Sequence, residues 1–373
     1  MSSKKSAKRL SFPLYVTKRI GFSKRKYWLI RIGGILLAFL VAGIVCSILK
    51  PGSFGTFFGE LFRGCFDFSD ISSVIDLLVT FSLLLLIAII LTPAFKMRFW
   101  NIGAEGQILM GCLAAAGVAK FSPSSWPNIV ILFVALLAAE AASLTWSIIP
   151  AIFKSFFNTN ETLFTLMMNY IAAIASTMAI SLWIKNGSQA FGILSQGVFP
   201  TILGNSGTLV VIFTVVIFAG MFFYINFGKA GYEVSVIGES IDTARYIGIN
   251  VRKVTIRTLA VSGLLFGIVG FFIVCGVHQS FSATIVEGKG FTGVLIAWLG
   301  HFDPVEIALF AFLAAVMERG TFTAASAINI SGSQFSAICT GVFFFIIIAC
   351  EFFSRYRVHI RHKEKPEQEV EQV

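Results

Sequence analysis

Long apolar runs alternate with short polar segments along most of the chain, a pattern typical of a protein that crosses a membrane several times. A helix needs about 20 mainly apolar residues to span the hydrocarbon core of a bilayer. Runs of this length predict transmembrane helices at residues 28–49, 71–93, 102–120, 128–152, 162–184, 207–226, 256–277 and 334–353.

A further apolar region covers residues 288–320 and is interrupted by the polar sequence GHFDP, from Gly300 to Pro304. Each of its two pieces is too short for a full span. Half-helices are tolerated at membrane depth where the surrounding protein satisfies their free backbone ends. The fold class that we predict is therefore an all-α, polytopic membrane bundle of about ten segments, in which residues 288–320 form two short or half-helices.

Basic residues lie mainly in alternate connections between the predicted spans. Cytoplasmic connections of membrane proteins carry an excess of Lys and Arg. With a cytoplasmic N-terminus and an even number of crossings, this rule places both termini in the cytoplasm. The inside connections then contain Lys96, Arg98, Lys154, Lys229, Arg245, Arg252, Lys253 and Arg257.

The composition agrees with a membrane protein, since 56% of the residues are hydrophobic and only 13% are charged. Soluble domains contain about 25% charged residues. Much of the net charge of +10 comes from a basic arm at residues 1–27, which is expected to contact anionic lipid at the cytoplasmic side rather than nucleic acid. We expect one membrane domain at 28–354, with a polar cytoplasmic loop at 227–255, and a charged cytoplasmic tail at 355–373.

The polar stretch RFWNIGAEGQILMG, from Arg98 to Gly111, lies between two apolar runs. Asn101 is predicted to cap the helix that follows, and Glu105 falls in its first turn, where the helix dipole favours a negative charge. A capped, tightly packed helix with small faces accounts for this stretch without any substrate. The alternative is that Glu105 and Gln107 line the inner end of a transport pathway. The residues of the small faces are Gly103, Gly106, Gly111 and Ala115.

A second polar stretch, NTNETLFTLMMNYIAAIAST, begins at Asn158, which has capping-box spacing with Glu161. Thr162, Thr165 and Asn169 follow on one face of the predicted helix. Such a stripe in a membrane helix either hydrogen-bonds to neighbouring helices or lines a pathway, and the sequence leaves both open.

Glu140 lies alone near the middle of the predicted span at 128–152. An isolated acid at that depth is a candidate for a transport pathway, or else faces another protein chain or water.

Several chemical functions have no support in the sequence. It contains no GxxxxGK[ST], HExxH or GxSxG pattern, so we expect neither ATP hydrolysis nor another enzymatic activity in this chain, and no cofactor. The six scattered cysteines include no CxxC pair. His301, Asp303 and Glu306 are close in sequence but are better explained as a polar turn than as a metal site.

Five segments occur in the same order as in a known family, between about residues 71 and 350. They resemble the inner-membrane permeases of bacterial ABC importers of the branched-chain amino acid/ribose permease superfamily, most of all its nucleoside and simple-sugar branch. A GGxDLSVG-like element of the ribose branch is missing, which favours nucleoside-like substrates, although a nucleoside, a simple sugar and a flavin-like vitamin all remain open. The segments are FWNIGAEGQILMG, NETLFTLMMNYIA, GESIDTARYIGINV, SGLLFGIVG and GKGFTGVLIAWLGHFDPVEIAL.

The resemblance implies a multi-pass protein of the bacterial plasma membrane that forms the translocation pathway of an ABC importer. It also implies three partners: an ATP-binding cassette ATPase, a second permease chain, identical or different, and an extracytoplasmic substrate-binding lipoprotein. A short cytoplasmic coupling helix would contact the ATPase, with Ser240 as its cap and Gly248 at its end. The candidate coupling residues are Gly238, Glu239, Ala244, Arg245, Tyr246 and Gly248.

Two other functions remain as alternatives to this reading. An ion-gradient-driven transporter would need paired acids or bases within the membrane, and Glu140 is the single acid that the sequence reading identifies there. An intramembrane enzyme would need converging His, Asp or Ser groups, for which the sequence offers no set.

Overall fold

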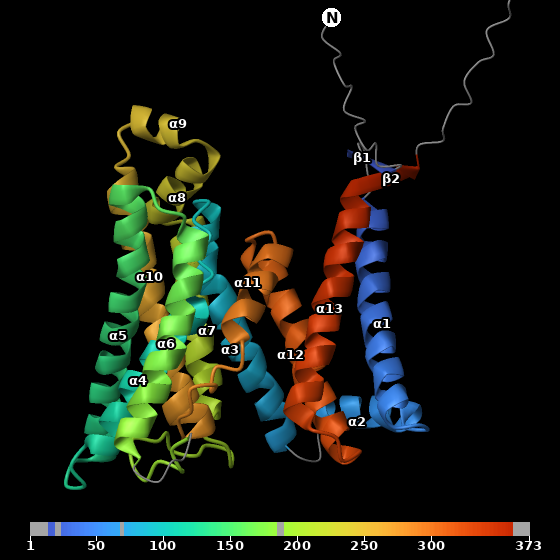
Figure 1. Ribbon diagram of the computed structural model, residues 1–373, viewed down its shortest axis with the longest axis horizontal. Helices are drawn as coiled ribbons and strands as arrows, with labels where there is room; N and C mark the ends of the chain where they lie inside the picture. The colour runs from blue at the N-terminus through green and yellow to red at the C-terminus, as the bar shows by residue number, and fades with distance from the viewer. Residues whose placement is uncertain (1–13, 19–23, 68–70, 185–189, 361–373) are drawn as a thin grey trace, which may run out of the picture. The chain divides into compact units, whose positions relative to one another are not determined.

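The computed structural model describes residues 14–18, 24–67, 71–184 and 190–360 (Figure 1). Most of the described chain is helical, as predicted. Parts of the basic arm, at residues 1–13 and 19–23, and of the tail, at residues 361–373, lie outside the described residues. Among the described residues, eight helices are long and apolar enough to span a membrane: Trp28–Leu49, Ile71–Lys96, Asn128–Phe157, Glu161–Trp183, Thr208–Asn226, Val251–His278, Pro304–Ala327 and Gly332–Arg355.

The chain divides into two compact units, residues 1–54 with 337–373 and residues 55–336. The first unit contains helix α1 (Lys24–Leu49) and most of α13 (Gly332–Arg355). Strand β1 (Leu14–Lys18) pairs antiparallel with β2 (Tyr356–Ile360), so that Val16 lies opposite Val358. The pairing supplies partners for backbone groups that neither short segment can satisfy alone.

A buried ion pair joins the two helices of the first unit. Arg31 Nε lies 3.3 Å from Glu351 Oε2, and Arg355 Nε lies 2.7 Å from Glu351 Oε1. Arg31 and Glu351 are both buried. Removing one partner of such a pair would leave a buried charge uncompensated, which is strongly unfavourable.

The second unit contains the remaining helices and is described on its own from here on. They are α2 (Phe54–Phe66), α3 (Ile71–Lys96), α4 (Ala104–Phe121), α5 (Asn128–Phe157), α6 (Glu161–Trp183), α7 (Thr208–Asn226), α8 (Lys229–Glu239), α9 (Ile241–Tyr246), α10 (Val251–Phe271), the π-helix η1 (Phe272–His278), α11 (Lys289–Leu299) and α12 (Pro304–Ala327). Helices α2 and α8 were not predicted.

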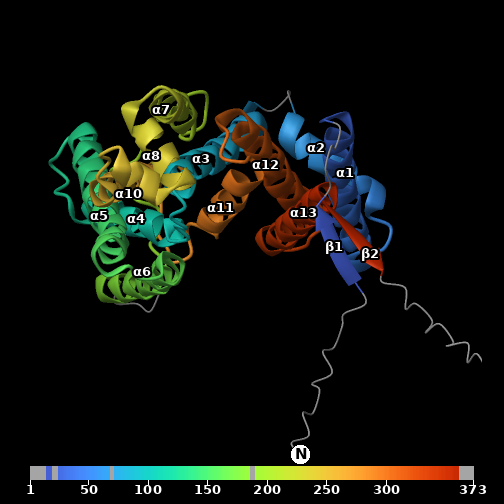
Figure 2. The same ribbon diagram turned by 90° about the horizontal axis from the view of Figure 1, so that it is seen from above.

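The core of the second unit is formed by α3, α4, α5 and α10 (Figure 2). Residues 82–95 of α3 are buried without interruption, which requires neighbours on every side of that helix. Glycines bring α10 close to its neighbours. A Cβ atom at Gly267 would lie 2.6 Å from the Ala139 carbonyl oxygen, and one at Gly111 would lie 3.1 Å from Gly267 Cα. The predicted role of Gly111 in close helix approach is therefore confirmed.

The region 288–320 differs in part from its prediction. Helix α11 has 11 residues and is short, as predicted, but α12 has 24 residues and is long enough to span a membrane. The prediction of two short pieces was therefore wrong for the second. Its end was placed too early because Glu318 and Arg319 interrupt the apolar run, whereas in the structure both side chains form ion pairs and the helix continues to Ala327.

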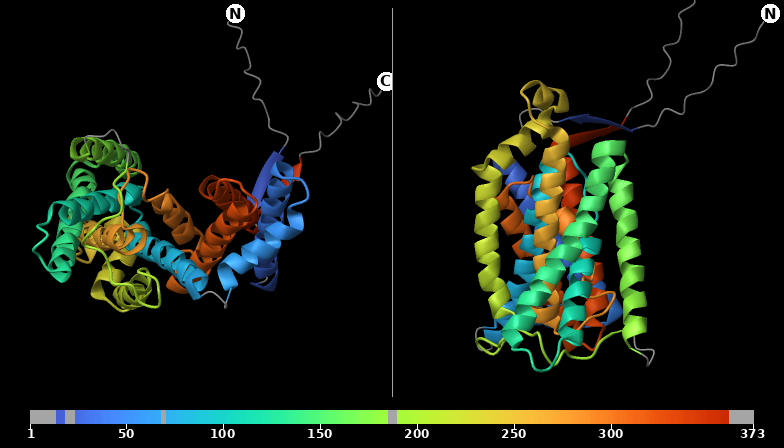
Figure 3. Two further views of the ribbon diagram at one scale, coloured as in Figure 1. Left: turned by 90° about the horizontal axis from the view of Figure 1, so that it is seen from below. Right: turned by 90° about the vertical axis from the view of Figure 1, so that its left-hand side faces the viewer.

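Helices α8 and α9 lie at one end of the second unit, where α3, α5 and α7 finish and α6 and α10 begin (Figures 1 and 3). A short helix is thus observed in the predicted place as α9, and its coupling role stays a prediction. Ser240 caps α9, since its side chain accepts a hydrogen bond from the Thr243 N–H at 3.2 Å. Gly248 follows the helix with a φ of +86°, a backbone conformation that favours glycine. Both predicted boundary residues are confirmed.

Candidate functional site

The stretch from Met97 to Gly103 is not helical and connects α3 to α4. Backbone N–H and C=O groups in such a segment have no helical partners, and inside a membrane each unsatisfied group is costly. The residues that supply partners to this connection therefore decide whether it is stable at that position. They come from the end of α3, from α6 and from the connection itself.

Helix α6 satisfies the start of α4 through two polar side chains. Asn169 Oδ1 accepts from the Gly106 N–H at 2.9 Å, and Asn169 Nδ2 donates to the Ile102 carbonyl at 2.9 Å. Thr165 Oγ1 accepts from the Ile102 N–H at 3.2 Å. Thr165 and Asn169 are both buried. Of the two roles left open by the sequence, these contacts are those of interhelical hydrogen bonding. The pathway-lining role stays a prediction, as it does for the partly buried Thr162.

Asn169→Ala is expected to weaken the packing of α4 on α6. The substitution leaves one buried N–H and one buried C=O without a partner, each at about 1–3 kcal/mol. The variant should melt at a lower temperature in detergent. Thr177→Ala on the same helix is the control, because the Thr177 hydroxyl is exposed and bonds only within α6, to the Ala173 carbonyl. Equal melting temperatures for the two variants would contradict the assigned role of Asn169.

Asn101 does not occupy the capping position that we predicted. Helix α4 begins at Ala104 with Gly103 as its N-cap, and that cap has no side-chain hydrogen bond. Asn101 Oδ1 instead accepts from the Gly103 N–H at 3.0 Å, and Gln107 Nε2 lies 3.4 Å from the same oxygen. Both Asn101 and Gln107 are buried. Asn101 therefore closes a tight turn before the helix.

The capping box predicted for α6 is also displaced. Asn158 ends α5 in a left-handed conformation, and Asn160 caps α6 by accepting from the Leu163 N–H at 3.1 Å. Glu161 forms an ion pair with Lys154, at 2.8 Å between Oε2 and Nζ. An Asn-x-Asn sequence offers two capping residues, and the chain reversal between α5 and α6 uses one for each helix end.

Glu105 holds the first turn of α11. Its Oε1 accepts from the Gly288 N–H at 2.9 Å, and its Oε2 accepts from the Gly290 N–H at 2.7 Å. A carboxylate is favourable at the N-terminus of a helix, where backbone N–H groups are free. A Cβ atom at Gly290 would lie 2.5 Å from the Glu105 backbone nitrogen, so glycine allows this close approach. Glu105 thus joins the starts of α4 and α11, which are far apart in sequence.

Glu140 lies on α5, partly buried, with α10 close to its backbone at Gly267. No hydrogen bond or ion pair to its carboxylate is found among the described residues. The contacts within the described chain therefore give its carboxylate no structural role. Its assignment to the pathway stays a prediction.

A second set of charges was missed by the sequence analysis. Lys289 Nζ lies 2.7 Å from Glu287 Oε2 and 3.4 Å from Glu318 Oε1. Arg319 forms an ion pair with Asp76, whose Oδ1 also accepts from Asn205 Nδ2 at 2.8 Å. We call Asp76, Glu287, Lys289, Glu318 and Arg319 the ionic cluster.

The signal that could have found this cluster was present in the sequence. Asp76 lies inside a predicted span, and the Glu318–Arg319 pair interrupts the second apolar piece of 288–320. Ionisable residues within apolar spans are functional candidates by default. The same rule that selected Glu140 therefore also selects Asp76, Glu318 and Arg319, so more than one acid lies within the predicted apolar segments.

The elbow formed by α8 and α9 packs onto the connection between α3 and α4. Ala244 of α9 and Ile237 of α8 belong to one buried apolar cluster with Met97 and Phe99. A Cβ atom at Gly238 would collide with the Lys96 carbonyl oxygen, so α8 and the end of α3 are in close backbone contact. The elbow is therefore packed directly against the stretch that precedes α4.

The six candidate coupling residues divide into two groups. Gly238 and Ala244 are buried against the rest of the second unit, whereas Glu239, Arg245, Tyr246 and Gly248 are exposed. Tyr246 is 92% exposed. Arg245 Nη1 lies 3.6 Å from Asp242 Oδ1 within the same short helix, so it pairs with Asp242 and not with Glu239.

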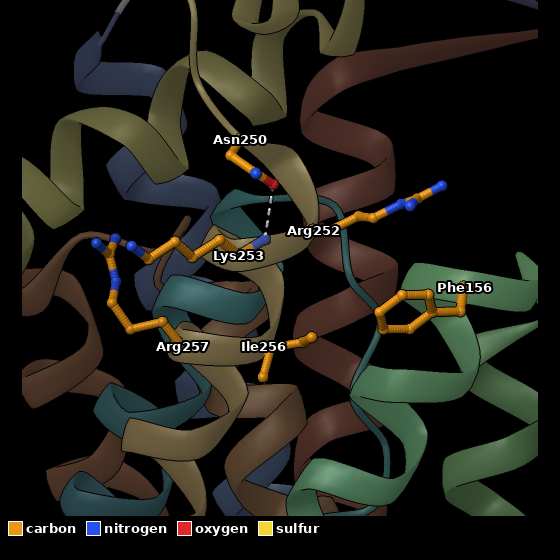
Figure 4. A pocket seen from close by; sticks show the side chains of 6 residues that line it. All are labelled: Phe156, Asn250, Arg252, Lys253, Ile256 and Arg257. Carbon is orange, nitrogen blue, oxygen red and sulfur yellow. Dashed lines mark hydrogen bonds between the residues drawn. The ribbon is translucent and has the colours of Figure 1, made fainter.

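A basic groove lies at the same end of the second unit (Figure 4). The Arg252 guanidinium lies 5.4 Å from the ring centre of Phe156, and Arg257 Nη2 lies 2.8 Å from Glu233 Oε2 on α8. Asn250 caps α10 by accepting from the Lys253 N–H at 3.1 Å. The groove therefore adds positive charge to this end. The ion pair between Arg257 and Glu233 connects α10 to α8. It is lined by Phe156, Asn250, Arg252, Lys253, Ile256 and Arg257.

The turn between α11 and α12 uses its polar residues locally. Asp303 caps α12 by accepting from the N–H groups of Val305 and Glu306, at 2.9 and 3.2 Å. His301 Nδ1 lies 3.0 Å from Glu306 Oε2. Within the described residues, no group of three or more His, Cys, Asp or Glu side chains is arranged to hold a metal ion.

These features define a multi-pass membrane protein with a broken, polar segment inside its helical bundle. A sequence profile described as the permease component of the branched-chain amino acid transport system matches residues 73–350. The chain belongs to this permease family, in agreement with the resemblance noted in its sequence.

Three relatives are informative about the branch of the family. A glucose ABC transporter permease of Haloferax volcanii is 26% identical over 347 residues, covering 87% of this chain and 88% of the relative. A guanosine ABC transporter permease of Bacillus subtilis is 28% identical over 292 residues, covering 75% and 82%. A nucleoside ABC transporter permease of Lactococcus lactis is 29% identical over 262 residues, covering 66% and 72%.

Proposed function

We propose that this chain is a permease subunit of an ABC importer and forms the translocation pathway for a nucleoside or a simple sugar. The observation that carries the proposal is similarity over most of the chain to permeases named for guanosine, nucleosides and glucose. In this proposal an extracytoplasmic lipoprotein delivers the solute, and a second permease chain completes the pathway. ATP is hydrolysed by a separate subunit.

The charge distribution supports a cytoplasmic position for the α8–α9 end of the second unit. Cytoplasmic ends of membrane proteins are enriched in Lys and Arg near the helix termini. We infer that this end faces the ATPase and that the chain termini are also cytoplasmic. The basic residues there are Lys96, Arg98, Lys154, Lys229, Arg245, Arg252, Lys253 and Arg257.

In the proposed coupling mechanism, the ATPase binds the exposed surface of the elbow at Glu239, Arg245, Tyr246 and Gly248. The buried residues Gly238 and Ala244 hold the elbow against the rest of the bundle. Because Ala244 packs with Met97 and Phe99, displacement of the elbow reaches the start of α4, and Glu105 connects that point to α11. This contiguous packing gives ATP hydrolysis a physical route to the pathway.

The transport proposal is tested by uptake of labelled guanosine and labelled glucose in cells that lack or regain this chain. Restored uptake of one of them is expected to depend on ATP and to persist when a protonophore collapses the ion gradient while glycolysis maintains ATP. Uptake that follows the ion gradient at constant ATP would instead favour a secondary transporter.

Tyr246→Ala is expected to lower uptake by more than about tenfold, because an aromatic anchor at a protein interface is worth about 2 kcal/mol or more. The ATPase should no longer co-purify with the variant, while the amount of protein in the membrane stays unchanged. Tyr170→Ala, at an exposed tyrosine of α6, is the matched control. Normal co-purification and uptake with Tyr246→Ala would remove Tyr246 from the coupling surface.

A further inference from the structure

The ionic cluster brings together side chains from three helices and one loop of the second unit. Asp76 comes from α3, Lys289 from the first turn of α11, and Glu318 and Arg319 from α12. Glu287 comes from the loop before α11. Two cations face three carboxylates, so the cluster carries one excess negative charge.

Lys289 is enclosed, while the two carboxylates that it contacts are partly accessible. The side chain of Lys289 is 8% exposed, whereas those of Glu287 and Glu318 are 51% and 24% exposed. The ammonium therefore contacts both carboxylates and is itself shielded from solvent. A carboxylate offers about four lone-pair positions, and one contact with Lys289 leaves most of them unused.

Charges at this position are informative because α3 and α12 are membrane-spanning helices. Partly exposed carboxylates are very costly against lipid and are found where they face water or a polar partner. The exposed parts of Glu287 and Glu318 are therefore expected to face water or a polar partner rather than lipid.

The polar residues near α4 differ in this respect. Thr165, Asn169 and Gln107 are buried, and Thr165 and Asn169 direct their hydrogen bonds to backbone groups of the segment before and at the start of α4. In this conformation they present no accessible group to a solute. Compared with these three residues near α4, the ionic cluster offers more accessible hydrogen-bonding groups.

We propose that Glu287 and Glu318 form a hydroxyl-binding site on the translocation pathway, with Lys289 as the residue that positions both carboxylates. The inference rests on the proposed transport function and adds the part of the solute that is recognised. Carboxylates accept hydrogen bonds from vicinal hydroxyls, which a ribose and a hexose share. The site thus suits the polyol part of a nucleoside or sugar and is indifferent to the base.

The experiment uses cysteine labelling in membrane vesicles that contain the full transporter. Glu287→Cys and Glu318→Cys are made separately with Cys350→Ser, because the five other cysteines are buried. Glu287 lies in a loop and is half exposed, so its substitution is the less disruptive of the two. Each variant is treated with a charged, membrane-impermeant methanethiosulfonate reagent, and Phe133→Cys at an exposed position of the apolar helix α5 is the control.

Both cluster cysteines are expected to react, and Phe133→Cys is expected to react only with an uncharged maleimide. Guanosine or glucose at about ten times its dissociation constant should slow the cluster reaction on the order of tenfold, because that concentration leaves about one site in ten empty. With guanosine as the protecting solute, 2′,3′-dideoxyguanosine should give no protection, since it lacks the vicinal hydroxyls.

Three results would overturn the inference. They are absence of reaction with the charged reagent at both positions, reaction without protection by guanosine or glucose, and equal protection by guanosine and the dideoxy compound. Uptake by the parent Cys350→Ser protein is measured in parallel. Failure of ATP-dependent uptake in that parent refutes the transport function itself, whereas normal uptake with unprotected labelling refutes only the hydroxyl-binding site.

Discussion

Replacing Glu105 with alanine is expected to reduce ATP-dependent uptake at least tenfold. Glu105 is the acceptor for the N–H groups of Gly288 and Gly290, and its loss leaves both without that partner. An unsatisfied buried N–H costs about 1–3 kcal/mol, so the two together cost on the order of 2–6 kcal/mol. That free energy is enough to displace the first turn of α11. Lys289 lies in this turn, so the ionic cluster would be displaced with it.

The measurement combines uptake with hydrogen–deuterium exchange at residues 286–292. Exchange should accelerate there in Glu105→Ala. Glu105→Gln should be intermediate, because an amide has one carbonyl oxygen with which to accept a hydrogen bond. Glu60→Ala is the control, since Glu60 lies 4.0 Å from Arg63 in a surface pair worth about 0–1 kcal/mol. Wild-type uptake with unchanged exchange in Glu105→Ala would show that the hydrogen bonds from Gly288 and Gly290 to Glu105 have no part in transport.

Gly267→Val is expected to destabilise the core of the second unit strongly. A Cβ atom there would lie 2.6 Å from both the Ala139 carbonyl oxygen and Glu140 Cα, which are backbone atoms that no rotamer change can move. Overpacking of this kind costs about 1–3 kcal/mol or more. The melting temperature in detergent should fall by roughly 5–10 °C, given about 2–4 °C per kcal/mol for a protein of this size.

Gly220→Val is the matched control for this substitution. Gly220 lies within α7, and a Cβ atom there would meet no heavy atom within 4 Å. Valine also has a slightly higher helix propensity than glycine, so the melting temperature should be unchanged or slightly higher. A similar fall for both variants would mean that the α5–α10 contact is not the cause.

The spans and their order could be predicted from the sequence because they depend on local composition. The predicted span at 207–226 corresponds to α7 at Thr208–Asn226, and that at 71–93 corresponds to α3 at Ile71–Lys96. The short helix α9 was also located, because Ser240 and Gly248 act on their own neighbours in the chain. Such signals need no knowledge of what lies beside them.

The roles of individual polar residues could not be predicted in the same way. Asn169 and Glu105 each satisfy backbone groups of a different helix, Asn169 of α4 and Glu105 of α11. The sequence showed that these groups were costly within a membrane but not which partners relieved that cost. For the same reason α12 was predicted too short, since the partners of Glu318 and Arg319 lie on other segments.

The sequence alone determined that this chain crosses a membrane many times and belongs with the importer permeases, because hydropathy and ordered motifs are properties of the chain itself. The tertiary structure alone decided which polar groups are enclosed and which are accessible. The difference arises from hydrogen bonds and ion pairs between distant segments. Asn169 and Thr165 are buried and hydrogen-bond to the backbone before and at the start of α4, whereas Glu287 and Glu318 remain partly exposed beside the buried Lys289.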